Sequence, residues 1–159
     1  MQAVGSDKTP PEQIACWQRL SGTVTTSGHL EPADFDALAA LGVRHAINLA
    51  MGDHPQILPD AAERFAALGI GYTHIPVPFA APEDTHFAAF VEAVETAPRP
   101  LHVHCIMNWR VSAMFYRWHR DVLGMNEGEA RAIMNRQWEP ETNDYPGAAA
   151  WARFIAAGD

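Results

Sequence analysis

The residues best able to do chemistry in this chain lie within positions 101–120, which read LHVHCIMNWRVSAMFYRWHR. A short apolar run ends at Cys105, Arg110 follows five positions later, and apolar residues then recur at helical spacing. A thiol between a buried strand and a helix lies where backbone N–H groups and the helix dipole favour an anion. Together with a nearby arginine, the same groups favour thiolate over thiol. The stretch therefore predicts a nucleophile and an oxyanion-binding loop in one place.

The two cysteines of the chain have different sequence surroundings. Cys16 lies in IACWQRL, with no cationic loop after it, and we interpret it as a small buried side chain. Cys105 is preceded by His104, and Arg110 and Ser112 follow it. These neighbours favour a nucleophile at Cys105 over a cysteine that only fills space in the core.

This loop resembles the signature of the cysteine-dependent tyrosine and dual-specificity phosphatases, in which His-Cys is followed by five residues, arginine, and serine or threonine. More narrowly, the chain is similar to a family of small bacterial tyrosine phosphatases. That family is related to the phosphatase-like domain found beside some β-lactamase-like hydrolases. The similarity rests on VTTSGHLEPADFDALAALGVRHAINLA, ALGIGYTHIPVPFAAPEDTHFAAF and VHCIMNWRVSA. It implies a cysteine-phosphatase fold and hydrolysis of a phosphomonoester, such as phosphotyrosine or a small phosphorylated molecule, through a phosphocysteine intermediate.

The resemblance also implies a role for each residue of the loop. Cys105 would attack phosphorus, and Arg110 would hold the phosphoryl oxygens. His104 would lie beneath the loop and hold it through hydrogen bonds. Ser112 would help the thiolate leave, although a serine at a helix start is otherwise an ordinary N-cap. The residues expected to surround the substrate are Ile106, Met107, Asn108, Trp109 and Arg110.

The loop departs from this signature in length and composition. Four residues, not five, separate Cys105 from Arg110, and none of them is glycine. Asn108 is the residue there that best tolerates left-handed backbone geometry. A shorter loop resembles that of the rhodanese-type sulfurtransferases, which carry a persulfide on cysteine. Three functions stay open at this point: a phosphatase, a sulfurtransferase, and an anion-binding module without catalysis.

A phosphatase of this kind also uses a carboxylic acid to protonate the leaving oxygen. The resemblance places an aspartate directly after Ile-Pro-Val, where this chain has Pro78. Asp84 is the first substitute on reach, followed by Glu83 and by Asp53 in the MGDHP loop. The two acids that follow Pro82 also suit a helix start, where carboxylates complement the helix dipole.

Composition restricts the class of partner. The chain has 159 residues, of which 48% are hydrophobic, and a net charge of −8. This length and composition suit a folded domain and not a disordered or membrane chain. The negative charge disfavours nucleic acid, which requires a basic surface. We therefore expect a phosphate-containing substrate or another oxyanion as the partner, and a cytoplasmic location, where free thiols persist.

Metal binding is not expected at the histidines beside the thiol. His102 and His104 lie on the same side of a strand, close to Cys105. However, no Cys-x-x-Cys or His-Glu-x-x-His pattern accompanies them. The sequence therefore predicts no metal and no cofactor, and it does not predict an oligomeric state.

Strand-like and helical segments alternate along the chain, which is the pattern of an α/β fold. Strands are expected within residues 15–28, 43–50, 72–77 and 101–105, and helices within 32–42, 60–69, 87–97, 111–122, 128–138 and 146–158. We predict a mostly parallel central sheet flanked by helices, with ligands at the carboxyl ends of strands, where Cys105 lies. Residues 1–13 are predicted to be a loose tail and 14–159 a single phosphatase-like domain.

Overall fold

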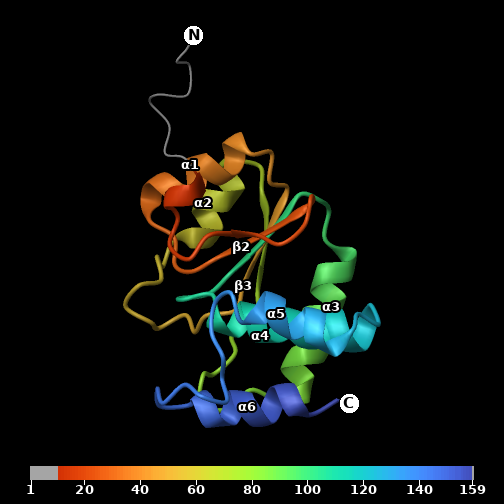
Figure 1. Ribbon diagram of the computed structural model, residues 1–159. Coiled ribbons are helices and arrows are strands. Elements are labelled where there is room, and N and C mark those ends of the chain that lie inside the picture. The colour runs from red at the N-terminus through yellow and green to blue at the C-terminus, as the bar shows by residue number, and fades with distance from the viewer. Residues whose placement is uncertain (1–10, 159) are drawn as a thin grey trace.

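The computed structural model describes residues 11–158 of the chain and has a five-stranded sheet at its centre (Figure 1). The sheet order is β1-β2-β5-β3-β4. Its strands are β1 (Gln18–Arg19), β2 (Val24–Ser27), β3 (His45–Asn48), β4 (Gly71–His74) and β5 (Leu101–His104). Only the β1–β2 pair is antiparallel among these strands. The prediction of a mostly parallel α/β sheet is therefore confirmed.

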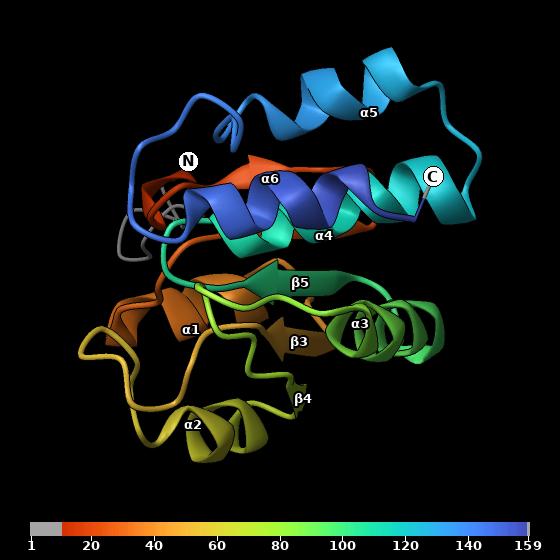
Figure 2. The same cartoon turned by 90° about the horizontal axis from the view of Figure 1, so that it is seen from below.

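Helices cover both faces of the sheet (Figure 2). One face carries α1 (Pro32–Ala40) and α2 (Ala61–Ala67). The other carries α3 (Asp84–Thr96), α4 (Trp109–Arg117) and α6 (Ala148–Ala156), while α5 (Glu127–Met134) packs on α4. Within residues 11–158 there are also two short elements, the 3-10 turn η2 (Pro11–Gln13) and the π-helical turn η3 (Trp118–Val122), which directly follows α4.

The larger hydrophobic core lies between the sheet and α4, and it fixes that helix. Every residue from Arg110 to Arg117 is buried. Val111, Met114 and Phe115 each expose 1% or less of their surface. Burying a side chain of this size contributes roughly 1.5–3 kcal/mol, so these three side chains stabilise the packing of α4 against the sheet. The start of α4, where the predicted anion loop ends, is therefore held in place by the core behind it.

The position of β5 within the sheet places Cys105 at the carboxyl edge of the parallel strands. β5 lies between β2 and β3, with Ser27 and Asn48 level with His104. Cys105 follows immediately, at the carboxyl edge of the parallel strands. Crevices at this edge are where open α/β sheets bind ligands, as the sequence predicted for this cysteine.

Some element boundaries differ from the sequence prediction. α3 begins at Asp84 because Glu83 is its N-cap and forms a capping box with His86. α5 ends at Met134, before the predicted limit of residue 138. In the predicted N-terminal tail, residues 1–10 lie outside the described part of the chain, and Pro11–Gln13 forms η2. No helix among the described residues is long and apolar enough to span a membrane.

Candidate active site

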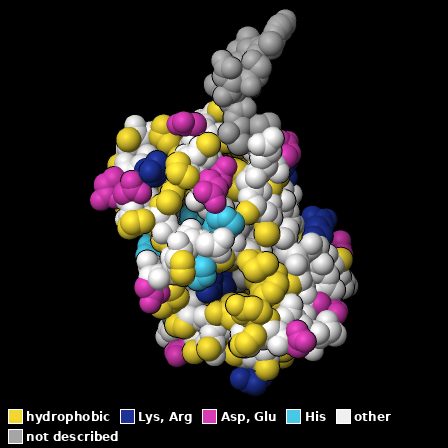
Figure 3. Space-filling view, turned by 90° about the vertical axis from the view of Figure 1, so that its left-hand side faces the viewer, with side chains coloured by type: hydrophobic (Ala, Val, Ile, Leu, Met, Phe, Trp, Pro, Cys, Tyr) yellow, Lys and Arg dark blue, Asp and Glu magenta, His cyan; other side chains and the backbone are white. Residues whose placement is uncertain are grey.

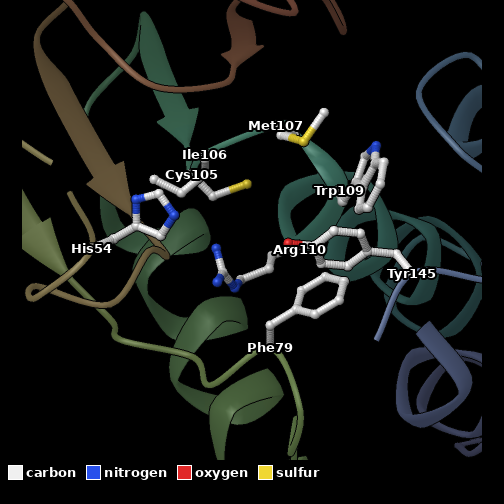
Figure 4. A pocket seen from close by; sticks show the side chains of 8 residues that line it. All are labelled: His54, Phe79, Cys105, Ile106, Met107, Trp109, Arg110 and Tyr145. Carbon is white, nitrogen blue, oxygen red and sulfur yellow. The ribbon is translucent and has the colours of Figure 1, made fainter. Parts of the chain in front are cut away.

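A cavity of about 200 Å³ opens at the carboxyl end of β5 (Figure 4). It brings together the cysteine and the arginine that the sequence singled out. Figure 4 shows the Cys105 sulfur and the Arg110 guanidinium on the same side of the cavity, with aromatic rings opposite. The lining residues are His54, Phe79, Cys105, Ile106, Met107, Trp109, Arg110 and Tyr145.

Asn108 holds the loop from behind and does not line the cavity. Its backbone is left-handed, with φ 66°, so the geometry that the sequence favoured for this residue is confirmed. Its Nδ2 donates to the carbonyl of Cys16 and to Oγ1 of Thr26, both at 2.9 Å. Its Oδ1 accepts from Oγ of Ser112 at 3.1 Å. Asn108 therefore ties the loop to the N-terminal hairpin and to α4.

The bond to Asn108 changes the interpretation of Ser112. The resemblance implied that the Ser112 hydroxyl helps the thiolate leave. The other interpretation was an ordinary N-cap. In the structure that hydroxyl donates to Asn108, and Asn108 itself is the N-cap residue of α4. Ser112 stands one turn inside the helix, where it stabilises the loop through Asn108.

The turn that follows β2 supports the same loop through the backbone. The N–H of His29 donates to the carbonyl of Ile106 at 2.9 Å, and the N–H of Gly28 donates to Ala15 at 2.6 Å. A Cβ at position 28 would lie only 2.4 Å from the Ile106 carbonyl oxygen. Only glycine allows this approach, which explains the Thr-Ser-Gly turn in the sequence.

His104 does not hold the loop through hydrogen bonds as the resemblance implied. Among the described residues, neither ring nitrogen of His104 has a hydrogen-bond partner. Burial lowers the pKa of His104 to about 3, with a further contribution from His74, so the ring is neutral. The ring packs between His102 and Phe65, at centroid distances of 5.8 Å and 6.3 Å. Its contribution is therefore packing beneath the site.

His102 is the hydrogen-bonded histidine of this strand. Its two ring nitrogens lie 2.8 Å from the hydroxyls of Thr25 and Ser27 on β2. Burial lowers the pKa of His102 well below its usual value, and His104 adds to the effect. The side chain thus joins β5 to β2 just before Cys105.

Arg110 is a buried cation without an ion pair. It exposes 7% of its surface, and no carboxylate of residues 11–158 lies within ion-pair distance of it. Its Nε also has no hydrogen-bond partner in the described chain. The guanidinium lies 5.4 Å from the centre of the Phe79 ring. A buried charge is costly unless it is paired, so the cavity beside Arg110 suits an anion.

Cys105 and Cys16 are both free, but only Cys105 faces the cavity. Cys105 exposes 1% of its surface, whereas Cys16 is exposed and contributes its backbone carbonyl to the Asn108 bond. Partial desolvation raises the pKa of the Cys16 thiol, and the nearby Cys105 adds to the shift. The sequence interpretation of Cys16 as a buried side chain is therefore wrong, because the residue is exposed. Its raised pKa disfavours the thiolate, so Cys16 remains the poorer nucleophile of the two.

Aromatic side chains form the wall opposite the thiol. Trp109 stacks on the buried Trp138 with ring centres 4.7 Å apart, while Phe79 and Tyr145 complete the wall. The indole N–H of Trp151 donates to the carbonyl of Phe79 at 2.7 Å, which fixes this segment. Figure 3 shows the resulting surface: a basic group within a hollow, bordered by histidine and hydrophobic side chains.

The structure does not bring the predicted acids into this cavity. Asp84 forms an ion pair with Arg117, with 3.0 Å between Oδ1 and Nη1, and together with Glu83 it lines a separate cavity beside α6. The guanidinium of Arg117 lies over the rings of Phe87 and Phe154, and its ion pair keeps Asp84 at this separate cavity. Asp53 is not a lining residue either, although the next residue, His54, is.

Three lining residues were missed by the sequence analysis: His54, Phe79 and Tyr145. Each lies in a loop: His54 between β3 and α2, Phe79 between β4 and α3, and Tyr145 between α5 and α6. Loops at the carboxyl edge of a parallel sheet converge on its ligand, which is the signal that could have identified the first two. Within residues 11–158, no three His, Cys, Asp or Glu side chains are grouped so that they could hold a metal ion.

Comparison with solved structures shows proteins of the same fold. A DUF442 protein of Shewanella putrefaciens CN-32, described as a candidate phosphatase, is 23% identical with a TM-score of 0.73; the match covers 92% of this chain and 94% of that one. The core catalytic domain of the S. cerevisiae PP-IP phosphatase SIW14, solved with citrate, is 15% identical with a TM-score of 0.73, over 96% and 88% of the two chains.

TpbA of P. aeruginosa, solved with phosphotyrosine, is 13% identical with a TM-score of 0.70, over 95% and 88% of the two chains. No protein-family model and no curated protein sequence matches this chain. At these identities the likeness shows the fold alone.

Proposed function

We propose that this protein is a cysteine-dependent phosphatase that hydrolyses a phosphomonoester through a phosphocysteine intermediate. One observation carries the proposal: the buried, unpaired guanidinium of Arg110 shares a small cavity with the free thiol of Cys105. A cation without an acceptor and a nucleophile beside it suit a substrate that is both an anion and an electrophile. The shared fold with SIW14 and TpbA supports the same reaction class.

The proposed reaction has two steps. The Cys105 thiolate attacks phosphorus, the S–P bond forms, and the P–O bond to the leaving group breaks. Water then attacks the phosphocysteine, which releases inorganic phosphate and restores the thiolate. Arg110 binds two phosphoryl oxygens, an arrangement that also orients the phosphorus for in-line attack. The loop of Ile106, Met107, Asn108 and Trp109 shapes the binding site, with Asn108 acting from behind through its hydrogen bonds.

The aromatic wall favours a phosphate carried on an aromatic group. Trp109, Phe79 and Tyr145 offer ring faces and edges against which an aryl ring can pack. The cavity, at about 200 Å³, suits a single phosphorylated side chain more than a large ligand. A phosphotyrosine side chain fits both features.

The cavity lining includes no carboxylate, so the leaving group receives little help from an acid. Pro78 stands where the resemblance expects an aspartate. We therefore expect fast cleavage of aryl phosphates with good leaving groups and slow cleavage of alkyl phosphates, because an unprotonated alkoxide leaves poorly. The same absence favours a second candidate function, a module that binds a phosphorylated partner without turning it over.

Hydrolysis of p-nitrophenyl phosphate tests the proposal. Wild type is expected to turn it over, the Cys105→Ser variant to lose all turnover while it retains phosphate binding, and the matched Cys16→Ser variant to keep wild-type activity. Phosphate binding without turnover in wild type would favour the binding module. Transfer of sulfur from thiosulfate to cyanide, without aryl phosphate hydrolysis, would place the protein among the sulfurtransferases. A protein with none of these properties would contradict the proposal.

A further inference from the structure

His54 enters the cavity from the loop between β3 and α2, on the side of Cys105 and Ile106 and across from Trp109 and Tyr145. Figure 4 shows its imidazole pointing into the cavity, toward the Cys105 and Arg110 side chains. The loop fixes the residue on both sides: the N–H of His54 donates to Met51 at 3.2 Å, and its carbonyl accepts from Ile57 at 3.0 Å. The ring is therefore presented to the site by a structured turn.

The hydrogen bonding of the ring defines which nitrogen carries the proton. The backbone N–H of Gln56 donates to Nδ1 of His54 at 3.0 Å. Nδ1 can accept this bond only through its lone pair, so the neutral ring carries its proton on Nε2. Protonating Nδ1 would place two N–H groups against each other and would break the bond to Gln56. In the neutral ring, the free end that the loop presents is therefore the Nε2–H donor.

Two donors then face the same space. Nε2–H of His54 and the guanidinium of Arg110 both point into the cavity, and neither has an acceptor among the described residues. The other titratable side chains that line the cavity are Cys105 and Tyr145. Asp53, the neighbour of His54 in the loop, does not line it. An oxyanion next to Cys105 would satisfy both donors at once.

We propose that His54, as the neutral Nε2–H tautomer, donates a hydrogen bond to a non-bridging phosphoryl oxygen of the bound substrate. The inference rests on the proposed phosphatase function and adds a residue that binds the phosphoryl group together with Arg110. It also excludes His54 as the missing general acid, because a neutral imidazole does not give up its remaining N–H proton. His54 contributes by binding and orienting the phosphoryl group.

Glutamine and alanine substitutions distinguish a donor from an acid. His54→Gln can place an amide N–H near the position of Nε2, whereas His54→Ala removes the donor. A hydrogen bond to a charged group contributes about 1.5–3 kcal/mol, so His54→Ala should weaken phosphate binding by roughly ten- to a hundredfold. We expect His54→Gln to recover most of this loss. Both effects can be measured by calorimetry in the Cys105→Ser background, without any turnover.

His86→Ala is the matched control. His86 also accepts a backbone N–H at Nδ1, from Glu83 at 2.9 Å, but it lies on α3 and does not line the cavity. We expect it to bind phosphate and hydrolyse p-nitrophenyl phosphate as wild type does. A similar loss in His86→Ala and His54→Ala would overturn the proposal, because the effect would then come from losing a backbone bond and not a donor to substrate.

The pH dependence of turnover gives the second readout. A neutral donor predicts that kcat/KM does not fall as the pH rises through the ordinary imidazole pKa of about 6.5. Suppose instead that kcat/KM of wild type falls in that pH window, that neither His54 variant shows the fall, and that His54→Gln is as slow as His54→Ala. That result would make His54 an acid and refute the proposal. Wild-type turnover and phosphate binding that are insensitive to His54→Ala would refute it and leave the phosphatase function intact. If wild type did not hydrolyse p-nitrophenyl phosphate at all, the result would instead count against the phosphatase function.

Discussion

Replacing Gly28 with alanine tests whether the turn after β2 positions the loop that carries the nucleophile, residues 105–110. The added Cβ would lie 2.4 Å from the Ile106 carbonyl oxygen, whereas ordinary contact begins at 3.4 Å, so the carbonyl must retreat by about 1 Å. Ile106 follows Cys105 directly, and its carbonyl also accepts the bond from His29. A misplacement of about 1 Å near a reacting group can reduce a rate about a hundredfold. We expect kcat/KM for p-nitrophenyl phosphate to fall by that order in Gly28→Ala.

The same substitution should cost about 1–3 kcal/mol in the free energy of unfolding, measured by urea titration, because the contact is with backbone that cannot rotate away. Gly22→Ala is the matched control in the same hairpin, since a Cβ there meets nothing within 4 Å. We expect its kcat/KM to equal that of wild type. A Gly28→Ala protein as active as Gly22→Ala would refute the argument that this close approach sets the loop.

Four more predictions concern individual side chains. The pKa of His104 in the folded protein is about 3, below the ordinary value of 6.5, so the unfolded chain binds this proton more tightly. The free energy of unfolding, measured by urea titration, should therefore fall as the pH drops from 6.5 toward 3. The fall should be less steep in the His104→Phe variant. Asp84→Asn should leave the ratio of aryl to alkyl phosphate turnover unchanged, because Asp84 lines another cavity; a selective loss on alkyl phosphates would make it the acid. Pro78→Asp should raise turnover of alkyl phosphates alone, and no rise would mean that this loop does not reach the leaving group. Tyr145→Leu should raise KM for aryl phosphates more than for alkyl ones, and equal effects would argue against an aromatic wall that selects the substrate.

The sequence predicted what short-range patterns determine. The apolar run before Cys105 and the helical spacing after Arg110 identified β5 and α4, and the sheet order then placed both residues at one cavity. The left-handed Asn108 could be predicted because few other residues adopt that conformation readily.

Other features depend on contacts between distant segments. His104 was expected to hold the loop through hydrogen bonds, but neither of its ring nitrogens has a partner among the described residues. Asn108 holds the loop instead, through hydrogen bonds to Cys16 and Thr26, which are 92 and 82 positions earlier in the chain. Asp84 was expected at the substrate, but Arg117, on a different helix, pairs with it. His54 and Tyr145 reach the cavity from loops whose paths no local pattern specifies. Long-range packing overrides the local signal in each case.

The division of the cavity between distant segments bears on how such a protein can diverge. Cys105 and Arg110 come from the β5–α4 unit, which the sheet and the core hold, while Tyr145 comes from the connection between α5 and α6, and Trp138 supports Trp109 from the same region. Changes in the segment after α5 can therefore alter which molecule is accepted without disturbing the reacting groups. Selection can act on the two parts at different rates, so related chains could share the thiol and the arginine and yet differ widely in substrate.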